Sequence, residues 1–262
     1  METKKVIIVG GGIIGLATAY YLDLEGHNVS VIDKGKLDSG TSHINSGYLT
    51  PSHIVPMAAP GVMSKGIRWM FNTTSPFYIK PRFDLDLISW GLKFMKSCTP
   101  EHVKKSMKPI LDANLLSKKL YLEMQESKVF DFDLESKGLL MAYKTSNAEK
   151  EEAKVAFMAR DLGVKVNQLS QEQILKMQPN APMEVEGGFM YESDAHCTPE
   201  LFMNNLKKYL MARGVNFILN TEVSSFKRNG KKIQALRTDK GILKGDESVS
   251  YTHLRAHETQ SD

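Results

Sequence analysis

The chain opens with an apolar run, a cluster of glycines and a stretch expected to be helical. Val6 to Val9 are all β-branched or aliphatic, which is typical of a strand buried on both faces of a parallel sheet. A helix from Gly12 to about Glu25 is expected next, and Gly26 supplies a left-handed stop. Val29 to Ile32 form a second apolar run. This order predicts a strand, a helix and a second strand.

The glycines between the first strand and the helix follow the spacing G-x-G-x-x-G, with Gly10, Gly12 and Gly15 at the fixed positions. Gly10 permits a tight turn, Gly12 lets the backbone approach a pyrophosphate, and Gly15 lets the helix pack closely on the strand. Asp33 lies eighteen positions after Gly15, close to the offset of about 20 at which an acid binds ribose hydroxyls. The unit predicts a dinucleotide site. An acid disfavours the 2′-phosphate of NADP, whereas NAD and FAD both stay open.

Between Met57 and Pro100 the chain is rich in Met, Trp and Phe. Apolar residues recur at helical spacing in Ile67 to Phe71 and in Leu87 to Met95. We expect these helix faces to fill a core, and a lipid-facing helix is the alternative.

A helix is expected to begin at Pro100 and to be interrupted at Pro109, because an internal proline removes a hydrogen bond. A longer helix then runs to about Ser127. Its buried side is marked by Leu111, Leu115, Leu116, Leu120 and Met124.

The middle of the chain alternates strand and helix patterns, which predicts an antiparallel sheet with helices inserted between two pieces of the nucleotide domain. The elements are a strand at Gly138 to Tyr143, a helix at Ala148 to Leu162 closed by Gly163, a capping box at Ser170 to Gln173 and a strand at Gly187 to Glu192.

The last third predicts a helix followed by short strands. The elements are a helix at Glu200 to Arg213 stopped by Gly214, a strand at Val215 to Leu219, a hairpin of Ser224 to Arg228 with Lys231 to Thr238, and strands at Ile242 to Lys244 and Ser248 to Val249. A β-meander here suits FAD domains better than NAD dehydrogenases. The segment Asp194 to Glu200 clusters acid, imidazole and thiol, but it has no second spaced pair, so we expect no metal site.

The composition is that of a soluble globular protein, with 42% hydrophobic and 24% charged residues. The net charge of +4 comes from scattered lysines, so no nucleic-acid partner is expected. Cys98 and Cys197 form no C-x-x-C pair and indicate idle thiols in a reducing compartment. No run reaches the ~18 apolar residues of a membrane span, and no leader precedes the first strand. We expect an intracellular, cytoplasmic protein.

The polar, glycine-rich stretch from Lys34 to Pro51 is too irregular for a helix or strand, and on composition it could be a surface loop. Together with Gly10 to Gly15, Asp33 and Ala58 to Gly61, it resembles D-amino-acid dehydrogenase, a flavoprotein family of the D-amino-acid oxidase superfamily. The resemblance implies FAD. It places the ADP half on the glycines and on Asp33, the pyrophosphate near Thr41 and Ser42, and the isoalloxazine beside Asn45 to Leu49. It also implies that the Val223 backbone meets the adenine. The full set of expected cofactor-binding residues is Gly10, Gly12, Ile13, Ile14, Gly15, Asp33, Lys34, Thr41, Ser42, Asn45, Ser46, Gly47, Tyr48, Leu49 and Val223.

The predicted fold class is α/β, a Rossmann-like FAD-binding domain with a β-meander plus an inserted, incomplete α+β substrate domain. The expected ranges are residues 1–56 and 194–249 for the FAD-binding domain, 57–193 for the substrate region and 250–262 for a non-native tail. Relatives carry a Val-x-Ala-x-Gly motif after the last strand and then a long continuation, and neither is present here. We therefore expect a truncated chain whose tail packs against nothing.

The resemblance implies oxidative deamination of a D-amino acid through FAD. Electrons would pass to a quinone-type acceptor, and peripheral contact with the inner face of the cytoplasmic membrane is possible in such enzymes. The fragment itself is expected to be inactive, and no catalytic acid or base is assigned. The alternatives are oxidation of glycine, sarcosine, proline or a 2-hydroxy acid, a nucleotide-binding module without turnover, and an NAD dehydrogenase.

Overall fold

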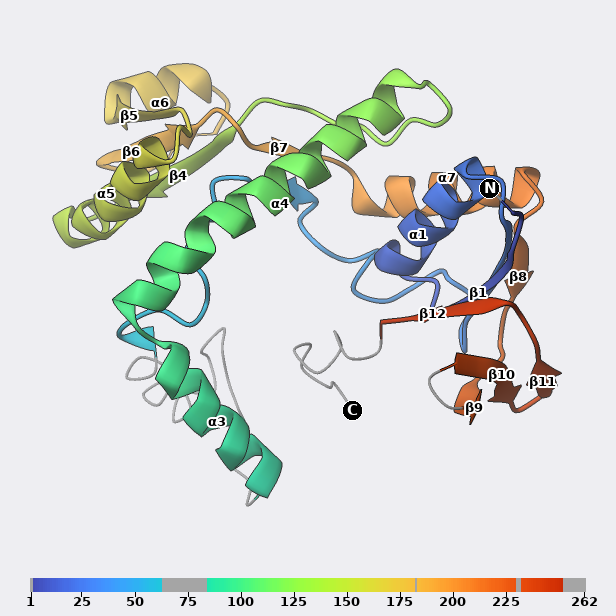
Figure 1. Ribbon diagram of the computed structural model, residues 1–262. Helices are drawn as coiled ribbons and strands as arrows, with labels where there is room; N and C mark the ends of the chain where they lie inside the picture. The colour runs from blue at the N-terminus through green and yellow to red at the C-terminus, as the bar shows by residue number, and fades with distance from the viewer. Residues whose placement is uncertain (1, 63–83, 182, 230–231, 252–262) are drawn as a thin grey trace. The chain divides into compact units, whose positions relative to one another are not determined.

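The computed structural model describes residues 2–62, 84–181, 183–229 and 232–251 (Figure 1). The helical stretch expected at Ile67 to Phe71 lies outside these ranges. The chain forms two compact units. Unit 1 comprises Met1–Gly47, Glu123–Leu134 and Cys197–Asp262, and unit 2 comprises Tyr48–Leu122 and Glu135–His196. The domain ranges expected from the sequence stay a prediction.

Unit 2 contains a three-stranded antiparallel sheet in the order β4-β6-β5. Its strands are β4 (Leu139–Tyr143), β5 (Val166–Ser170) and β6 (Gly187–Tyr191). The sequence correctly predicted an antiparallel sheet with β4 and β6. It missed β5, because VNQLS has exposed polar residues and only a weak apolar alternation.

The sequence predicts both helices between these strands, although α5 begins two residues before the expected Ala148. The helix α5 (Ser146–Asp161) is capped by Thr145, whose Oγ1 accepts the Ala148 N–H at 3.2 Å, and the chain leaves it through Gly163 at φ +84°. The helix α6 (Gln171–Met177) has the predicted capping box, with Ser170 and Gln173 bonded reciprocally. Local side-chain capping therefore sets both helix starts.

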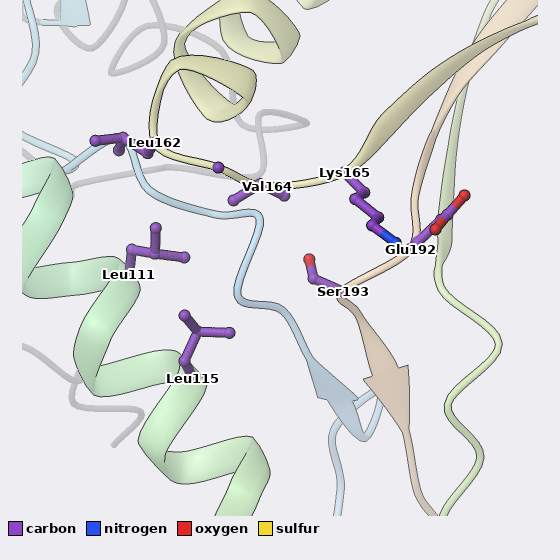
Figure 2. Close-up of a pocket in the computed structure, with 8 residues that line it drawn as sticks. Leu111, Leu115, Leu162, Val164, Lys165, Glu192 and Ser193 are labelled. Carbon is purple, nitrogen blue, oxygen red and sulfur yellow. The ribbon is translucent and has the colours of Figure 1, made fainter.

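A long helix, α4 (Pro100–Glu126), runs through Pro109 without a break, so the predicted interruption is wrong. The proline removes one backbone donor, and the hydrogen bonds on either side continue the helix. Leu111 and Met124 are buried as predicted, but Leu115 and Leu116 are exposed. Leu115 and Leu111 instead line a cavity of about 310 Å³ together with the turn between α5 and β5 and the residues that follow β6 (Figure 2).

The helix α3 (Leu85–Ser97) confirms the helical pattern at Leu87 to Met95, but not the expectation that this face fills a core. None of its thirteen residues, all of which the structure describes, is buried. Asp84 caps the helix by accepting the N–H groups of Asp86 and Leu87. No helix in the described ranges is long and apolar enough to cross a membrane.

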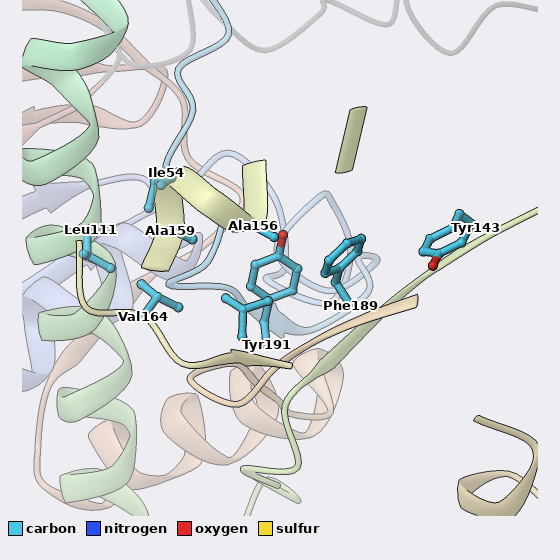
Figure 3. Packing of buried hydrophobic residues seen from close by; sticks show 9 residues of the cluster. Ile54, Leu111, Tyr143, Ala156, Ala159, Val164, Phe189 and Tyr191 are labelled. Atoms are coloured by element: carbon cyan, nitrogen blue, oxygen red, sulfur yellow. The ribbon is translucent and has the colours of Figure 1, made fainter. Parts of the chain in front are cut away.

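The core of unit 2 lies between α5 and one face of the sheet (Figure 3). Tyr143, Phe189 and Tyr191 alternate along β4 and β6 so that their rings share that face. Ala156 and Ala159 present the small side of α5 to them and are fully buried. Short side chains on the helix let it approach three large rings closely.

Unit 1 is built on a four-stranded parallel sheet in the order β12-β1-β2-β8, which confirms the Rossmann-like prediction. Its strands are β1 (Lys5–Val9), β2 (Asn28–Ile32), β8 (Asn216–Ile218) and β12 (Glu247–Ser250). The strand β1 lies between β12 and β2, which explains why Ile7 and Ile8 are almost fully buried. The predicted β-meander is present as β9 (Val223–Asn229), β10 (Lys232–Thr238) and β11 (Gly241–Leu243).

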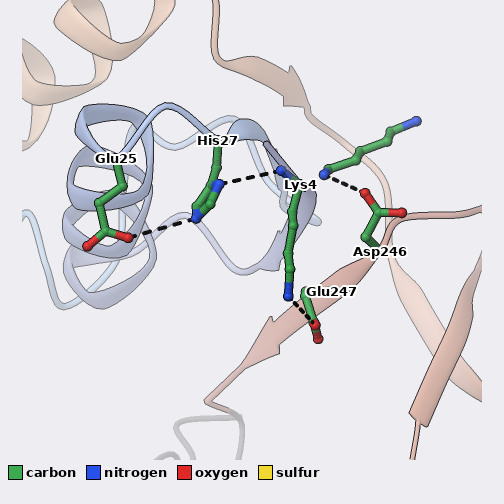
Figure 4. Close-up of polar contacts among 6 residues, drawn as sticks. Lys4, Glu25, His27, Asp246 and Glu247 are labelled. Carbon is green, nitrogen blue, oxygen red and sulfur yellow. Dashed lines mark hydrogen bonds and ion pairs between the residues drawn. The ribbon is translucent and has the colours of Figure 1, made fainter. Parts of the chain in front are cut away.

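Two helices, α1 (Ile13–Leu24) and α7 (Pro199–Ala212), pack against each other in unit 1. The Tyr20 and Tyr209 rings lie 5.7 Å apart, and Arg213 Nε pairs with Asp23 at 2.5 Å. At the start of β1, polar contacts join segments that are distant in sequence (Figure 4). Lys5 N donates to Asp246 Oδ2 at 2.7 Å, and Lys4 Nζ pairs with Glu247 at 3.0 Å.

The structure corrects the expectation that residues 250–262 pack against nothing. Ser250 pairs with Val9 in the sheet, and the Tyr251 hydroxyl donates to Gly10 O at 2.7 Å. The expectation is therefore wrong for these two residues. The rest of the segment lies outside the described residues.

A fully buried carboxylate, Asp194, organises the loop of unit 2 that follows β3 (Tyr48–Leu49). Its two oxygens accept the Ser52 N–H at 3.0 Å, the Ser52 hydroxyl at 2.5 Å and the Ser193 hydroxyl at 2.9 Å. Beside it, β3 pairs with β7 (Ala195–His196). Burying a carboxylate is costly unless donors surround it, so these three donors are a condition of the local fold.

Replacing Asp194 by Ala should lower the free energy of unfolding by about 3 kcal/mol, because the Ser52 N–H and both hydroxyls would lose a buried acceptor. Asp194→Asn keeps the shape and one acceptor oxygen, so its effect should be smaller. Urea denaturation followed by circular dichroism measures both variants. Equal stability of Asp194→Ala and the unsubstituted chain would contradict this account.

Candidate dinucleotide site

The glycine-rich turn joins β1 to α1 at the carboxyl end of the sheet. Gly10 adopts φ +98°, which favours glycine, and its N–H donates to Ile32 O at 2.8 Å. Gly12 is the residue before the helix, and the first intrahelical bond runs from Leu16 N to Gly12 O at 2.9 Å. The N–H groups of the first turn, which precede this bond, have no acceptor inside the helix. Such a turn presents donors and a positive dipole end to an anion.

Gly15 marks the closest approach of α1 to the turn. A Cβ atom added there would lie 1.9 Å from Gly10 O, a distance that no side chain can occupy. At Gly12 an added Cβ would lie 3.2 Å from Ser42 Oγ. The three glycines therefore meet different constraints: conformation at Gly10, a tight contact with the Ser42 side chain at Gly12 and helix packing at Gly15.

Asp33 follows β2 directly and lies beside the same turn. Its Oδ2 accepts the Gly11 N–H and its Oδ1 accepts the Gly35 N–H, each at 2.7 Å. Its main chain is fixed as well, since Asp33 O accepts the Thr221 N–H at 2.9 Å. Each carboxylate oxygen has a second lone pair. The acid can therefore hold the glycine turn in shape and still accept from ribose hydroxyls.

The polar loop reaches the glycine turn through Ser42, whose Oγ accepts the Ile13 N–H at 3.1 Å. Asn45 stabilises the loop itself. Its Nδ2 donates to Thr41 O at 3.1 Å, and its Oδ1 accepts the Gly47 N–H at 2.8 Å. The structure thus brings Ser42 to the first turn of α1, and Asn45 ties Thr41 and Gly47 together within the loop.

The end of the loop departs from the predicted irregular structure, because Tyr48 and Leu49 form β3 and pair with His196 and Ala195 in unit 2. Gly47 belongs to unit 1 and has φ +67°. An added Cβ there would lie 2.0 Å from Cys197 O, and Cys197 N donates to Gly47 O at 2.9 Å. Sequence patterns miss such two-residue strands because they contain no full period.

The remaining predicted residues occupy separate places in unit 1. Val223 begins β9 and packs against the core cluster that contains Ile7, Ile32 and Leu236. Lys34 and Ser46 are exposed. They lie within the loop, but no described contact assigns either one a role.

The sequence analysis missed two residues that shape the turn. Leu37 adopts φ +58° and is buried, and an added Cβ at Gly11 would lie 2.4 Å from its Cδ2. The sequence indicates this contact through Gly11, since the motif does not require a glycine at that position. Tyr251 is the second, since its hydroxyl lies 2.7 Å from where a Gly15 Cβ would be.

Electrostatics gives the nearby thiol no chemical role. Burial raises the pKa of the Cys197 thiol to about 11, so the thiolate is scarce at neutral pH. Backbone donors, Asp33 and small polar side chains are therefore the groups available to a ligand. A turn of this form between β1 and α1, an acid after β2 and a β-meander define the dinucleotide-binding class of α/β proteins.

Comparison with known proteins identifies the family. A family model described as "DAO: FAD dependent oxidoreductase" matches residues 5–249. The chain belongs to this family, and the resemblance drawn from the motifs is confirmed.

The relatives agree with the family but are longer than this chain. A D-amino acid dehydrogenase of Neisseria meningitidis is 29% identical over 250 residues, which are 94% of this chain and 60% of the relative. The chain thus spans about 60% of the length of the curated relatives it matches.

Solved structures show the same fold. Glycine oxidase from Geobacillus kaustophilus superposes with a TM-score of 0.62 at 21% identity, covering 95% of this chain and 55% of that one. L-α-Glycerophosphate oxidase from Mycoplasma pneumoniae, solved with FAD bound, gives 0.58 at 21% identity, covering 94% and 52%. The predicted fold class is confirmed, and FAD is the dinucleotide of this family.

Gly15→Ala should disrupt the joint between β1 and α1, because its Cβ would overlap Gly10 O. We expect a loss of about 3 kcal/mol in the free energy of unfolding. Gly91→Ala is the matched control, since Gly91 lies inside α3 with no atom within 4 Å of an added Cβ. Alanine there should stabilise the helix by ~0.5–1 kcal/mol. Similar denaturation midpoints for the two variants would contradict the assigned packing role.

Proposed function

We propose that this protein oxidises D-amino acids through FAD and passes the electrons to a quinone-type acceptor. The observation that carries the proposal is the glycine turn, where Gly15 permits a contact no side chain could make and where Asp33 holds the Gly11 N–H. The family match across residues 5–249 supports FAD as the ligand of that turn.

We propose that FAD is held by the residues that the sequence singled out. The first-turn amides of α1 bind the pyrophosphate, with Ser42 beside them, and Asp33 accepts from the ribose hydroxyls. The full set is Gly10, Gly12, Ile13, Ile14, Gly15, Asp33, Lys34, Thr41, Ser42, Asn45, Ser46, Gly47, Tyr48, Leu49 and Val223. Within it, the bond from Ile13 N to Ser42 Oγ supports a preformed pyrophosphate side, and the bonds of Asn45 hold the loop that would run beside the isoalloxazine.

FAD bound at this site would supply the redox chemistry, as the acceptor of a hydride from Cα of a neutral amine, and the imine product would hydrolyse in water. The chain contributes position and electrostatics. The loop Asn45 to Leu49 would fix one face of the isoalloxazine, because Gly47 is tied to Cys197 and Tyr48 to His196. No side chain in the chain is assigned as a catalytic acid or base.

The curated relatives support D-amino acids as the substrate class, since those from Neisseria meningitidis and Granulibacter bethesdensis are both named D-amino acid dehydrogenase. Oxidation of glycine, sarcosine, proline or a 2-hydroxy acid on the same scaffold is the second candidate. A glycine oxidase is among the structural neighbours, although at 21% identity it bears on the fold alone. A nucleotide-binding module without turnover is the third candidate.

We propose that α3 provides peripheral contact with a membrane, where a quinone acceptor would be met. Leu85, Ile88, Leu92 and Met95 recur at helical spacing, and between 45% and 84% of each is exposed. Lys93 and Lys96 lie on the same helix. An exposed apolar stripe with basic neighbours is typical of helices that lie in a lipid interface.

Gly12→Val should abolish FAD binding, because a branched side chain beside Ser42 would occupy the approach of the pyrophosphate. Asp33→Ala should weaken the binding of FAD by ~10–100-fold, because hydrogen bonds worth ~1.5–3 kcal/mol would be lost. The absorption spectrum of the purified protein and FAD titration by fluorescence quenching measure both. A yellow Gly12→Val protein would argue against this placement of the cofactor.

Added D-alanine should bleach the flavin band under anaerobic conditions, and L-alanine should not. Because the chain spans about 60% of its relatives, we expect bleaching only after the relatives' C-terminal part is joined to it. The measurement compares the 262-residue chain with the extended chain, each with FAD. Rapid stereoselective bleaching by the shorter chain would overturn the need for the extension. Bleaching by glycine or sarcosine in place of D-alanine would favour the second candidate.

A further inference from the structure

A second cavity in unit 2, of about 230 Å³, is lined by both polar and apolar residues. It is lined by the loop Ser52 to Val55, by Met141 of β4 and Tyr191 of β6, and by Glu152 and Val155 of α5. All of these residues belong to unit 2. The described part of the cavity lining therefore comes from one unit.

Glu152 provides the anionic group of this cavity. Its Oε1 accepts the Tyr191 hydroxyl at 2.6 Å. Burial, together with the bond to Glu152, raises the pKa of Tyr191 well above its usual range, so the phenol remains a donor. Figure 3 shows the Tyr191 ring standing on β6 with its hydroxyl toward α5. One donor fixes one oxygen of Glu152, and the carboxylate retains further acceptor positions.

His53 provides a second acceptor atom, its Nε2. Hydrogen bonds from His53 through Ser52 to Asp194 determine which of its ring nitrogens can accept. Ser52 Oγ has one proton and donates it to Asp194 Oδ2 at 2.5 Å. The contact between Ser52 Oγ and His53 Nδ1, at 3.2 Å, therefore requires an N–H on Nδ1. The neutral imidazole then carries its lone pair on Nε2. Asp194 thus sets the tautomer of a histidine that lines the cavity.

The charges around the cavity favour a cation. Glu152 lines it and Asp194 lies behind Ser52, whereas no Lys or Arg is among the described residues that line it. Arg160 is close enough to oppose the rise in the pKa of Tyr191. Its Nε and Nη2 both donate to Val166 O, at 3.0 and 2.8 Å. An anion would meet the Glu152 carboxylate here, with that of Asp194 buried behind Ser52. A carboxylate-bearing substrate therefore does not fit.

Another part of the cavity wall is made of apolar side chains. Ile54 is fully buried, and Val55, Met141 and Val155 complete that side. A hydrated inorganic cation would gain nothing from this wall, because apolar surface offers it no ligands. An alkyl chain would gain from leaving water against it. The ligand that matches both sides carries a positive N–H group at one end and a short hydrocarbon at the other.

We propose that this cavity binds a small primary alkylammonium ion. The ammonium donates to Glu152 and to His53 Nε2, and the alkyl chain packs against Ile54, Val55, Met141 and Val155. The site goes beyond the proposed oxidation of amino acids, since it has no group for a substrate carboxylate.

The test is a titration of the 262-residue chain with n-butylammonium chloride at constant ionic strength, followed by the ¹³C-methyl NMR signal of Met141. No FAD is added, so failure of the proposed FAD site leaves this measurement readable. We expect a saturable shift of the Met141 methyl signal. The uncharged n-butanol should bind at least about tenfold more weakly, because it lacks the charge-assisted hydrogen bonds.

Three variants separate the named contacts from general effects. Glu152→Gln keeps an acceptor for Tyr191 and should weaken binding at least about tenfold. Glu151→Gln, its exposed neighbour that pairs with Lys154, is the matched control and should bind like the unsubstituted chain. Val155→Phe fills the cavity from the same helix and should abolish binding while Glu152 is kept.

Several results would overturn the proposal. The first is no saturable shift in the unsubstituted chain, and the second is an equal affinity of Glu152→Gln and the unsubstituted chain for n-butylammonium. The third is n-butanol binding as tightly as n-butylammonium, which would indicate an apolar void. If Glu152→Gln fails to fold, as judged by circular dichroism, Val155→Phe decides. Binding retained in Val155→Phe would place the ligand elsewhere and exclude this cavity.

Discussion

The contact between the first turn of α1 and the end of β1 is the constraint on which unit 1 depends. At Gly15 the helix comes so close to Gly10 O that a Cβ would lie 1.9 Å from it. This approach sets the direction of α1 and aims its first-turn N–H groups at one place. Asp33, at the end of β2, reaches the same turn because parallel strands end at the same edge of a sheet. Helix, acid and loop are positioned together by one backbone contact.

What the sequence could predict was local. The glycine spacing, the β-branched runs, the capping box at Ser170 and the stops at Gly26 and Gly163 act within a few residues, and the structure shows each of them. The β-meander also followed from local turn and strand patterns, and the resemblance added the cofactor. The missed features depend on distant partners. Tyr48 and Leu49 are extended because they meet residues almost 150 positions away, and Asp33 binds Gly11 across 22 positions. Pro109 was misjudged for a different reason, since one lost donor was treated as the end of a helix.

Unit 2 depends on a polar anchor as much as on its apolar core. Asp194 is fully buried and holds Ser52 through both its amide and its hydroxyl. A core of aromatic rings and alanines fixes how α5 lies on the sheet, but it does not fix a loop. Directional hydrogen bonds fix the loop. Here they determine the position of Ile54 and which ring nitrogen of His53 carries the proton. Loss of this acid would therefore change side chains that it never touches.

The pairing of β1 with β12 has a consequence for synthesis on the ribosome. Val6 pairs with Glu247, so β1 cannot complete its pairing in the parallel sheet until residues 241 positions later have been synthesised. At ~5–20 residues per second, that interval is on the order of 10–50 s. During this time Ile7 and Ile8 are present in a nascent chain whose sheet has an open edge at β1. A chaperone that binds short aliphatic strands would therefore act on this protein early in its translation. A chain released before β12 is made would leave that edge of β1 unpaired.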